Sequence, residues 1–138
     1  MAQYSDIFKI THNNVIPEKG HILISEPFLQ DAYFQRSVVL LVEHDSKGSM
    51  GFVLNKKLEM LLNTVVPELK DFHEIPVYLG GPVASDRLFF IHTLGENIVP
   101  NAVEFSKNLY MGGDFDALKR YALSGHNLEG KVKFFLGY

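Results

Sequence analysis

The stretch from residue 37 to residue 55, SVVLLVEHDSKGSMGFVLN, decides the fold. Two apolar runs, SVVLLVEH at 37–44 and GFVLN at 51–55, flank the polar residues 45–48. The first run is rich in β-branched and aliphatic residues, which is typical of a strand covered on both faces. A short glycine-containing turn between two such runs predicts an antiparallel hairpin. We therefore expect this hairpin to organise the core.

The hairpin also carries a serine, a histidine and acids within a few positions. A strand rises about 3.3 Å per residue, so Ser37 and Glu43 are expected roughly 20 Å apart. Glu43 and His44 are expected on opposite faces, because side chains alternate along a strand. Since a nucleophile and its base must lie within about 3 Å of each other, these residues do not predict one nucleophilic site.

The expected pairing gathers the polar side chains at two ends of the hairpin. If residues 45–48 form the loop, His44 faces Ser49, and the same register places Asn55 opposite Val38. Arg36 then lies diagonal to Asn55, within the about 7–8 Å that a long side chain can span. The open end thus collects Arg36, Ser37 and Asn55, and the turn end collects Glu43, His44 and Ser49.

Each end has a ligand-binding and a structural interpretation. Arginine offers a planar fork of donors to a small anion or carboxylate, so Arg36, Ser37 and Asn55 are candidate ligand-binding residues. The favoured alternative is that Arg36 and Asn55 satisfy backbone groups where two strands end. Glu43 and His44 are candidates for a metal or acid–base role. A surface turn is favoured there, because one histidine beside one carboxylate is not a ligand set.

Gly80 and Gly81 are the remaining candidate site residues. A glycine-rich turn can present backbone amides to an anion. A tight turn that needs glycine is the favoured interpretation. The six histidines show no spacing typical of a metal site, and the sequence predicts neither a metal nor a cofactor.

The rest of the chain is interpreted from periodicity and from glycine and proline. Strands are expected at 21–25, 76–79, 87–93 and 131–136. A helix is expected at 114–124, with Asp114 as N-cap and Gly125 at its C-terminal end. Residues 57–72 combine helical spacing with Pro67 and stay ambiguous, and residues 94–113 are expected to be irregular.

Composition limits the class of protein. The chain has 138 residues, 46% of them hydrophobic, and no cysteine, which predicts one domain over 1–138 without disulfides. The net charge is −3 and the basic residues are scattered, so direct nucleic-acid binding has no support from charge. No signal-peptide pattern and no apolar run approaching about 20 residues occur, so we expect a cytoplasmic protein that does not enter a membrane.

The combined motifs resemble the AlgH/YqgE-like family of bacterial proteins. The resemblance covers about residue 20 to the last residue and rests on Arg36-Ser37-Val38-Val39-Leu40-Leu41, Glu43-His44, Gly51, Val53-Leu54-Asn55, Gly80-Gly81-Pro82-Val83, His92, Gly112-Gly113-Asp114 and Gly137-Tyr138. It implies an α+β fold with a bent, largely antiparallel, barrel-like β-sheet flanked by a few helices. It supplies no catalytic residues, because the family has no established biochemical function.

The resemblance also implies that residues 1–19 are an N-terminal extension and that family members continue past Tyr138. A C-terminal part of the family domain is then expected to be absent, and an exposed edge or patch would favour self-association. Some members carry the label of transcriptional regulator of alginate synthesis. We expect a non-catalytic binding or regulatory protein with a protein partner. The alternative is a small-molecule or anion-binding protein, or an enzyme, that uses Arg36, Ser37 and Asn55.

Overall fold

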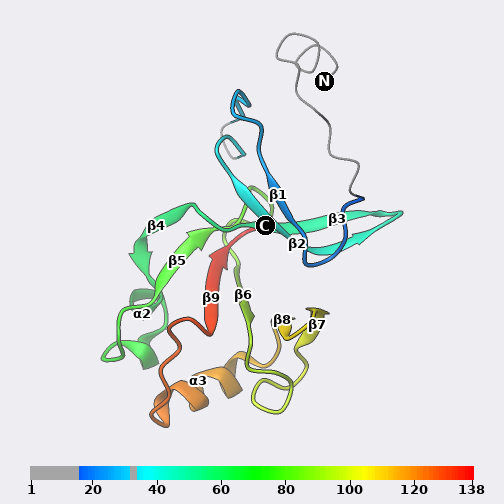
Figure 1. The fold of residues 1–138 in the computed structure, drawn as a ribbon. Helices are drawn as coiled ribbons and strands as arrows, with labels where there is room; N and C mark the ends of the chain where they lie inside the picture. Colours follow the sequence, from blue (N-terminus) through cyan, green and yellow to red (C-terminus); the bar gives the residue numbers. More distant parts are fainter. Residues whose placement is uncertain (1–15, 32–33) are drawn as a thin grey trace.

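The computed structural model describes residues 16–31 and 34–138, which form two β-sheets and three short helical segments (Figure 1). The first sheet has the order β1-β2-β3, and the second has the order β4-β5-β9-β6-β8-β7. The strands are β1 (Ile22–Ile24), β2 (Val38–Asp45), β3 (Gly48–Val53), β4 (Lys57–Leu61), β5 (Pro76–Leu79), β6 (Leu88–His92), β7 (Val103–Ser106), β8 (Leu109–Met111) and β9 (Val132–Leu136). The helical segments are α2 (Leu62–Val65), the 3₁₀ helix η1 (Pro67–Leu69) and α3 (Phe115–Leu123).

The arrangement confirms the α+β class. Every strand pair of the described chain is antiparallel except β5 with β9, which run parallel. In the described residues β4 and β7 stand at the two ends of the larger sheet, so its strands form an open, bent sheet and not a closed barrel. The expected extension at 1–19 lies largely outside the described residues.

The predicted hairpin is present as β2 and β3, and its register is correct next to the turn. His44 pairs with Ser49, as expected from a loop centred on residues 46 and 47. The register then shifts between Leu41 and Glu43, which marks a β-bulge at Val42. Beyond the bulge each residue of β2 pairs with a residue of β3 that lies one position earlier than expected. The expected pairing of Val38 with Asn55 is therefore wrong.

The larger sheet buries a different core on each face. Phe90 and Phe134 belong to the cluster covered by α2, η1 and α3, whereas their neighbours Ile91 and Phe135 belong to the cluster under the hairpin. This division follows from the alternation of side chains along a strand. Phe52 of β3 joins the two sheets, because its fully buried ring stacks on Phe135 with centroids 4.7 Å apart.

The expectation that residues 94–113 are irregular is wrong in part. They contain β7 and β8, which pair antiparallel around a tight turn in which Asn108 has a φ of 62°. Asparagine tolerates this left-handed conformation better than most residues. Strands of three or four residues are too short to show a clear alternation, so the pattern was not visible.

Proline, glycine and capping side chains determine where the helical segments begin and end. Residues 57–72 divide into β4, the single turn α2 and η1, which begins at Pro67. The predicted caps of α3 are confirmed: Asp114 Oδ1 accepts a hydrogen bond from the Ala117 N–H at 3.2 Å, and Gly125 has a φ of 105°. Pro67 at the start of η1 and Gly125 past the end of α3 each occupy a position that the residue favours at helix termini.

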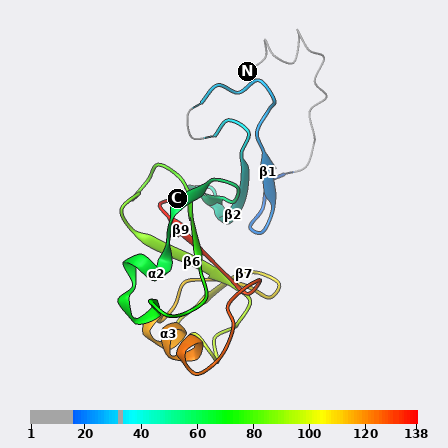
Figure 2. The ribbon, with the colours of Figure 1, turned by 90° about the vertical axis from the view of Figure 1, so that its left-hand side faces the viewer.

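Figure 2 shows that β1 and the chain following it project away from the larger sheet and from the helices. We call residues 22–31 together with Phe34 the β1 arm. Its strand is the outer strand of the three-stranded sheet, and all three of its residues are exposed. Among the residues that the structure describes, no strand pairs with the outer edge of β1.

Candidate functional site

Asn55 closes the open end of the hairpin through backbone groups. Its Oδ1 accepts a hydrogen bond from the Val38 N–H at 3.0 Å, and its Nδ2 donates to the Arg36 carbonyl oxygen at 2.8 Å. The side chain therefore takes the place of a ladder partner beyond the last paired residues. The bulge at Val42 does not prevent Arg36 and Asn55 from meeting, because the amide reaches back across the shifted register.

Ser37 lies beside this contact and is buried, with 1% of its surface exposed. Its N–H donates to Ser25 Oγ at 2.8 Å, and its hydroxyl donates to the Gln35 carbonyl oxygen at 3.3 Å. The first bond ties the start of β2 to the end of β1, and the second is local to the chain just before β2. A buried hydroxyl held in this way fits the structural interpretation of the cluster.

Arg36 is the member of the cluster whose side chain stays available. Its φ of 52° is unusual for a residue with a Cβ. Its guanidinium makes no hydrogen bond or ion pair to any residue among 16–31 and 34–138. None of the three cavities described below is lined by Arg36, Ser37 or Asn55.

The turn end brings Glu43 and His44 to a small cavity. His44 Nδ1 contacts Ser49 Oγ, as the predicted register requires. A cavity of about 330 Å³ opens between this turn and β7, lined among others by Glu43, His44, Lys19 and Glu104. Within the described part of the chain no group of three or more metal-ligating side chains occurs. A second cavity of about 490 Å³ lies beside α2 and η1.

Gly80 and Gly81 lie where β5 approaches the end of β9. The Gly80 N–H donates to the Leu136 carbonyl oxygen at 2.8 Å, and the Gly80 carbonyl oxygen accepts from the Val53 N–H at 2.8 Å. A Cβ added to either glycine would collide with the backbone of Gly137 or Tyr138. Close backbone approach therefore explains why glycine occupies both positions.

His92 is a buried polar residue of β6, with 2% of its surface exposed. Its Nδ1 accepts from the Leu94 N–H at 3.3 Å, so the ring nitrogen Nε2 carries the proton that it donates to the Gly112 carbonyl oxygen at 2.9 Å. Burial lowers the pKa of His92 below its usual value, and the bond to Gly112 offsets this only in part. Both nitrogens serve the fold, so His92 links β6 to β8.

The β1 arm concentrates exposed apolar side chains. Six of the eleven exposed large apolar residues of the described chain fall between residues 22 and 34. They are Ile22, Leu23, Ile24, Phe28, Leu29 and Phe34. Contiguous exposed apolar surface on a protein marks an interaction site more often than scattered single residues do.

The sequence predicts the strand at 21–25 but indicates no role for it. An alternation of residues shows that a strand exists and does not show that it stands at the edge of its sheet. The signal available was Pro27 directly after the strand, because proline is confined to edges and strand ends.

None of the helices in the described residues has both the length and the hydropathy needed to cross a bilayer.

Comparison with known proteins gives a consistent assignment. A family model described as AlgH-like matches residues 22–138. A UPF0301 protein of Parabacteroides distasonis is 65% identical over 138 residues, which is all of this chain and 70% of that protein. A UPF0301 protein of Bacteroides thetaiotaomicron is 53% identical over 134 residues, covering 97% of this chain and 67% of its own length.

Two solved structures share the fold. The solution structure of the AlgH protein from Pseudomonas aeruginosa aligns with a TM-score of 0.68 at 31% identity, covering 94% of this chain and 70% of that one. A crystal structure of a Corynebacterium diphtheriae protein aligns with a TM-score of 0.71 at 20% identity, covering 91% and 67%. At that identity the second likeness shows the fold alone. The chain belongs to the AlgH-like family.

Proposed function

We propose that this chain is a non-catalytic binding protein that acts through protein contacts, with the β1 arm as its docking surface. The observation that carries the proposal is the exposure of the arm. Ile24, the last residue of β1, has 78% of its surface exposed. Isoleucine in that position costs solubility and gives the free chain no packing in return.

The backbone of the arm indicates how a partner would bind. The His21 carbonyl oxygen accepts from the Leu41 N–H at 3.0 Å, and the Ser25 N–H donates to the Ser37 carbonyl oxygen at 3.0 Å. Because hydrogen bonding to one side alternates along an antiparallel strand, the N–H and C=O groups of Ile22 and Ile24 point outward. An extended segment of a partner protein can pair with this edge, as in β-augmentation.

Regulation through protein contacts also agrees with the charge. The net charge of −3 and the scattered basic residues offer no positive face for the DNA backbone. A regulatory role of this family member would therefore pass through another protein. We keep a cytoplasmic location as part of this proposal, and cell fractionation tests it.

The proposal is tested by quantitative capture of partners from bacterial extract with a tagged chain. The wild type is compared with the Ile22→Lys/Ile24→Lys double variant, which adds charge to the edge strand. The Leu123→Lys variant is the matched control, because Leu123 is an exposed apolar residue on α3, outside the arm. At least one protein should be enriched by the wild type and by the control and lost from the double variant. Equal capture by all three chains, or no enrichment, would refute the proposal.

A second candidate function is binding of a small anion at Arg36. It is supported by the guanidinium, which has no hydrogen bond or ion pair among the described residues, and by Lys56. The Lys56 Nζ donates to the Gln35 carbonyl oxygen at 2.8 Å and brings a second cation to the same end of the hairpin. Titration with phosphate, followed by amide NMR, should shift the signals around Arg36 in the wild type and leave them unchanged in Arg36→Gln. Shifts that persist in this variant would remove the site from consideration.

A further inference from the structure

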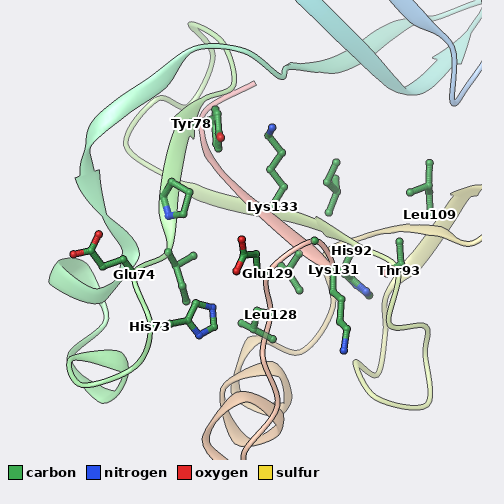
Figure 3. Close-up of a pocket in the computed structure, with 15 residues that line it drawn as sticks. His73, Glu74, Tyr78, His92, Thr93, Leu109, Leu128, Glu129, Lys131 and Lys133 are labelled. Atoms are coloured by element: carbon green, nitrogen blue, oxygen red, sulfur yellow. The ribbon is translucent and has the colours of Figure 1, made fainter.

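The largest of the three cavities lies elsewhere, on the hairpin-side face of the larger sheet. Its volume is about 580 Å³, which is within the range of small-molecule sites. The hairpin covers the Phe135 end of this face through Phe52. The cavity occupies the next part of the same face, and its walls come from β5, β6, β8, β9 and the loops before β5 and before β9 (Figure 3).

Lys133 is the unusual group in this cavity. It is half-buried on the sheet face, on the same side of β9 as Phe135. Its Nζ lies 3.9 Å from the centroid of the Tyr78 ring, which is a cation–π contact. Burial lowers the pKa of Lys133, with no carboxylate raising it. Nζ makes no ion pair or hydrogen bond with any of the residues that the structure describes.

The contact with the Tyr78 ring compensates only in part for the hydration that the Lys133 ammonium loses on burial. A ring face supplies electrostatic attraction but accepts no hydrogen bond of ordinary strength. The three donors of Nζ therefore lack a strong acceptor among the described side chains. Lys131 lies two residues earlier on the same face and adds a second positive charge at the other end of the cavity.

The rest of the lining limits the kind of anion. Ile91, Leu109 and Leu128 give the cavity an apolar surface beside Lys133. Glu129 also lines the cavity, and Figure 3 shows its carboxylate among the labelled side chains, so its charge opposes most strongly a ligand with several negative charges. Glu74 is another lining residue, and Figure 3 shows its carboxylate turned away from the other labelled side chains.

We propose that this cavity binds a small amphipathic carboxylate. Its carboxylate group accepts hydrogen bonds from Lys133 Nζ, and its aromatic or aliphatic body lies on Ile91 and Leu109. A monoanion fits the single desolvated ammonium, and the apolar body replaces water on the open sheet face. No residue of the β1 arm lines this cavity, so a negative result at one of the two sites does not bear on the other.

The test is a titration of the chain with naphthoate, followed residue by residue in two-dimensional amide NMR spectra. The amide shifts should cluster at Tyr78, Ile91, Thr93, Lys131 and Lys133. Naphthamide, which has the same rings without the charge, should bind about tenfold more weakly or less well still. This comparison uses the wild-type chain and does not depend on the stability of a variant.

Variants then test whether the Lys133 ammonium binds the carboxylate of the ligand. Lys133→Met keeps the apolar stem and should weaken naphthoate binding by about tenfold or more, whereas Lys133→Arg should largely keep it. Lys47→Met, at the exposed hairpin turn, is the matched control and should bind as the wild type does. Shifts confined to the β1 arm, equal binding of naphthoate and naphthamide, or wild-type affinity in Lys133→Met would each overturn the proposal.

Discussion

Asn63 in α2 shows how much one polar side chain can organise. Its Oδ1 accepts from the Ile75 N–H at 2.9 Å, and its Nδ2 lies within hydrogen-bond distance of three carbonyl oxygens. Those oxygens belong to Leu69, Phe72 and His73. One amide thus holds the loop from η1 to the start of β5.

Replacing Asn63 by alanine leaves several partly buried backbone groups without a partner. We expect the free energy of unfolding to fall by about 2–3 kcal/mol, because an unsatisfied buried group costs more than a lost average bond. Urea denaturation measures the change. Asn97→Ala in an exposed loop is the control and should change the stability by less than about 0.5 kcal/mol. An equal effect of the two variants would contradict this role.

His92 predicts a pH dependence of stability. Its pKa in the folded chain is lowered from the ordinary value of 6.5, so below that pH the unfolded chain binds a proton that the folded chain does not. The free energy of unfolding should therefore decrease as the pH falls below about 6.5, by up to about 1.4 kcal/mol per pH unit, until the folded pKa is passed.

Denaturation of the His92→Gln variant at several pH values isolates this contribution. Glutamine does not titrate. The slope of unfolding free energy against pH, just below the ordinary histidine pKa, should therefore decrease by up to the contribution of one bound proton. Asn97→Ala, which adds and removes no titratable group, serves as the control and should keep the wild-type slope. If His92→Gln and the wild type lose stability in parallel, His92 does not carry the dependence.

At the scale of the element, the hairpin depends on Asn55 at its open end. Asn55→Ala removes two hydrogen bonds to the backbone of β2 and of Arg36. Since the site is exposed and water can replace part of the loss, we expect a decrease of about 1 kcal/mol in unfolding free energy. Asn127→Ala, which removes one local bond to the Glu129 N–H, is the control. A variant as stable as this control would mean that Asn55 has no structural role.

The elements also show where sequence reasoning succeeds and where it stops. The hairpin turn, the pairing of His44 with Ser49 and the caps of α3 were predictable, because short-range chemistry determines them. The bulge at Val42 was not, since it depends on how β2 bends over the larger sheet. The parallel pairing of β5 with β9 joins segments far apart in sequence, which local patterns do not encode.

The candidate sites follow the same rule. The meeting of Arg36 with Asn55 was predicted from the hairpin, although through a register that the bulge changes. The cavity at Lys133 was not predicted, because it requires β5, β6, β8 and β9 together. The alternation of Lys131, Lys133 and Phe135 gave one usable signal: two lysines on the face of a strand that buries a phenylalanine.

At the scale of the whole molecule, Phe52 couples the three-stranded sheet to the larger one. Its buried ring contacts Phe135 and Phe89, with centroids 4.7 and 5.7 Å away. Phe52→Ala should lower the free energy of unfolding by about 3–5 kcal/mol. Leu123→Ala on the exposed face of α3 is the control and should cost less than about 1 kcal/mol.

Hydrogen exchange separates a local from a global effect of Phe52→Ala. Loss of the ring should speed exchange of the β2 and β3 amides more than that of β6 and β9, because the hairpin loses its main apolar contact with the body. Uniform acceleration across both sheets would contradict this coupling role.

The most direct test of the central claim is photo-cross-linking from the β1 arm in bacterial cells. A photoreactive phenylalanine analogue is placed at Ile24 and, as the control, at Leu123, both of which are exposed. Protein docking at the arm predicts a cross-linked product with a second, different protein from position 24 and none from position 123. No product from position 24, the same products from both positions, or only a product of two copies of this chain would contradict it.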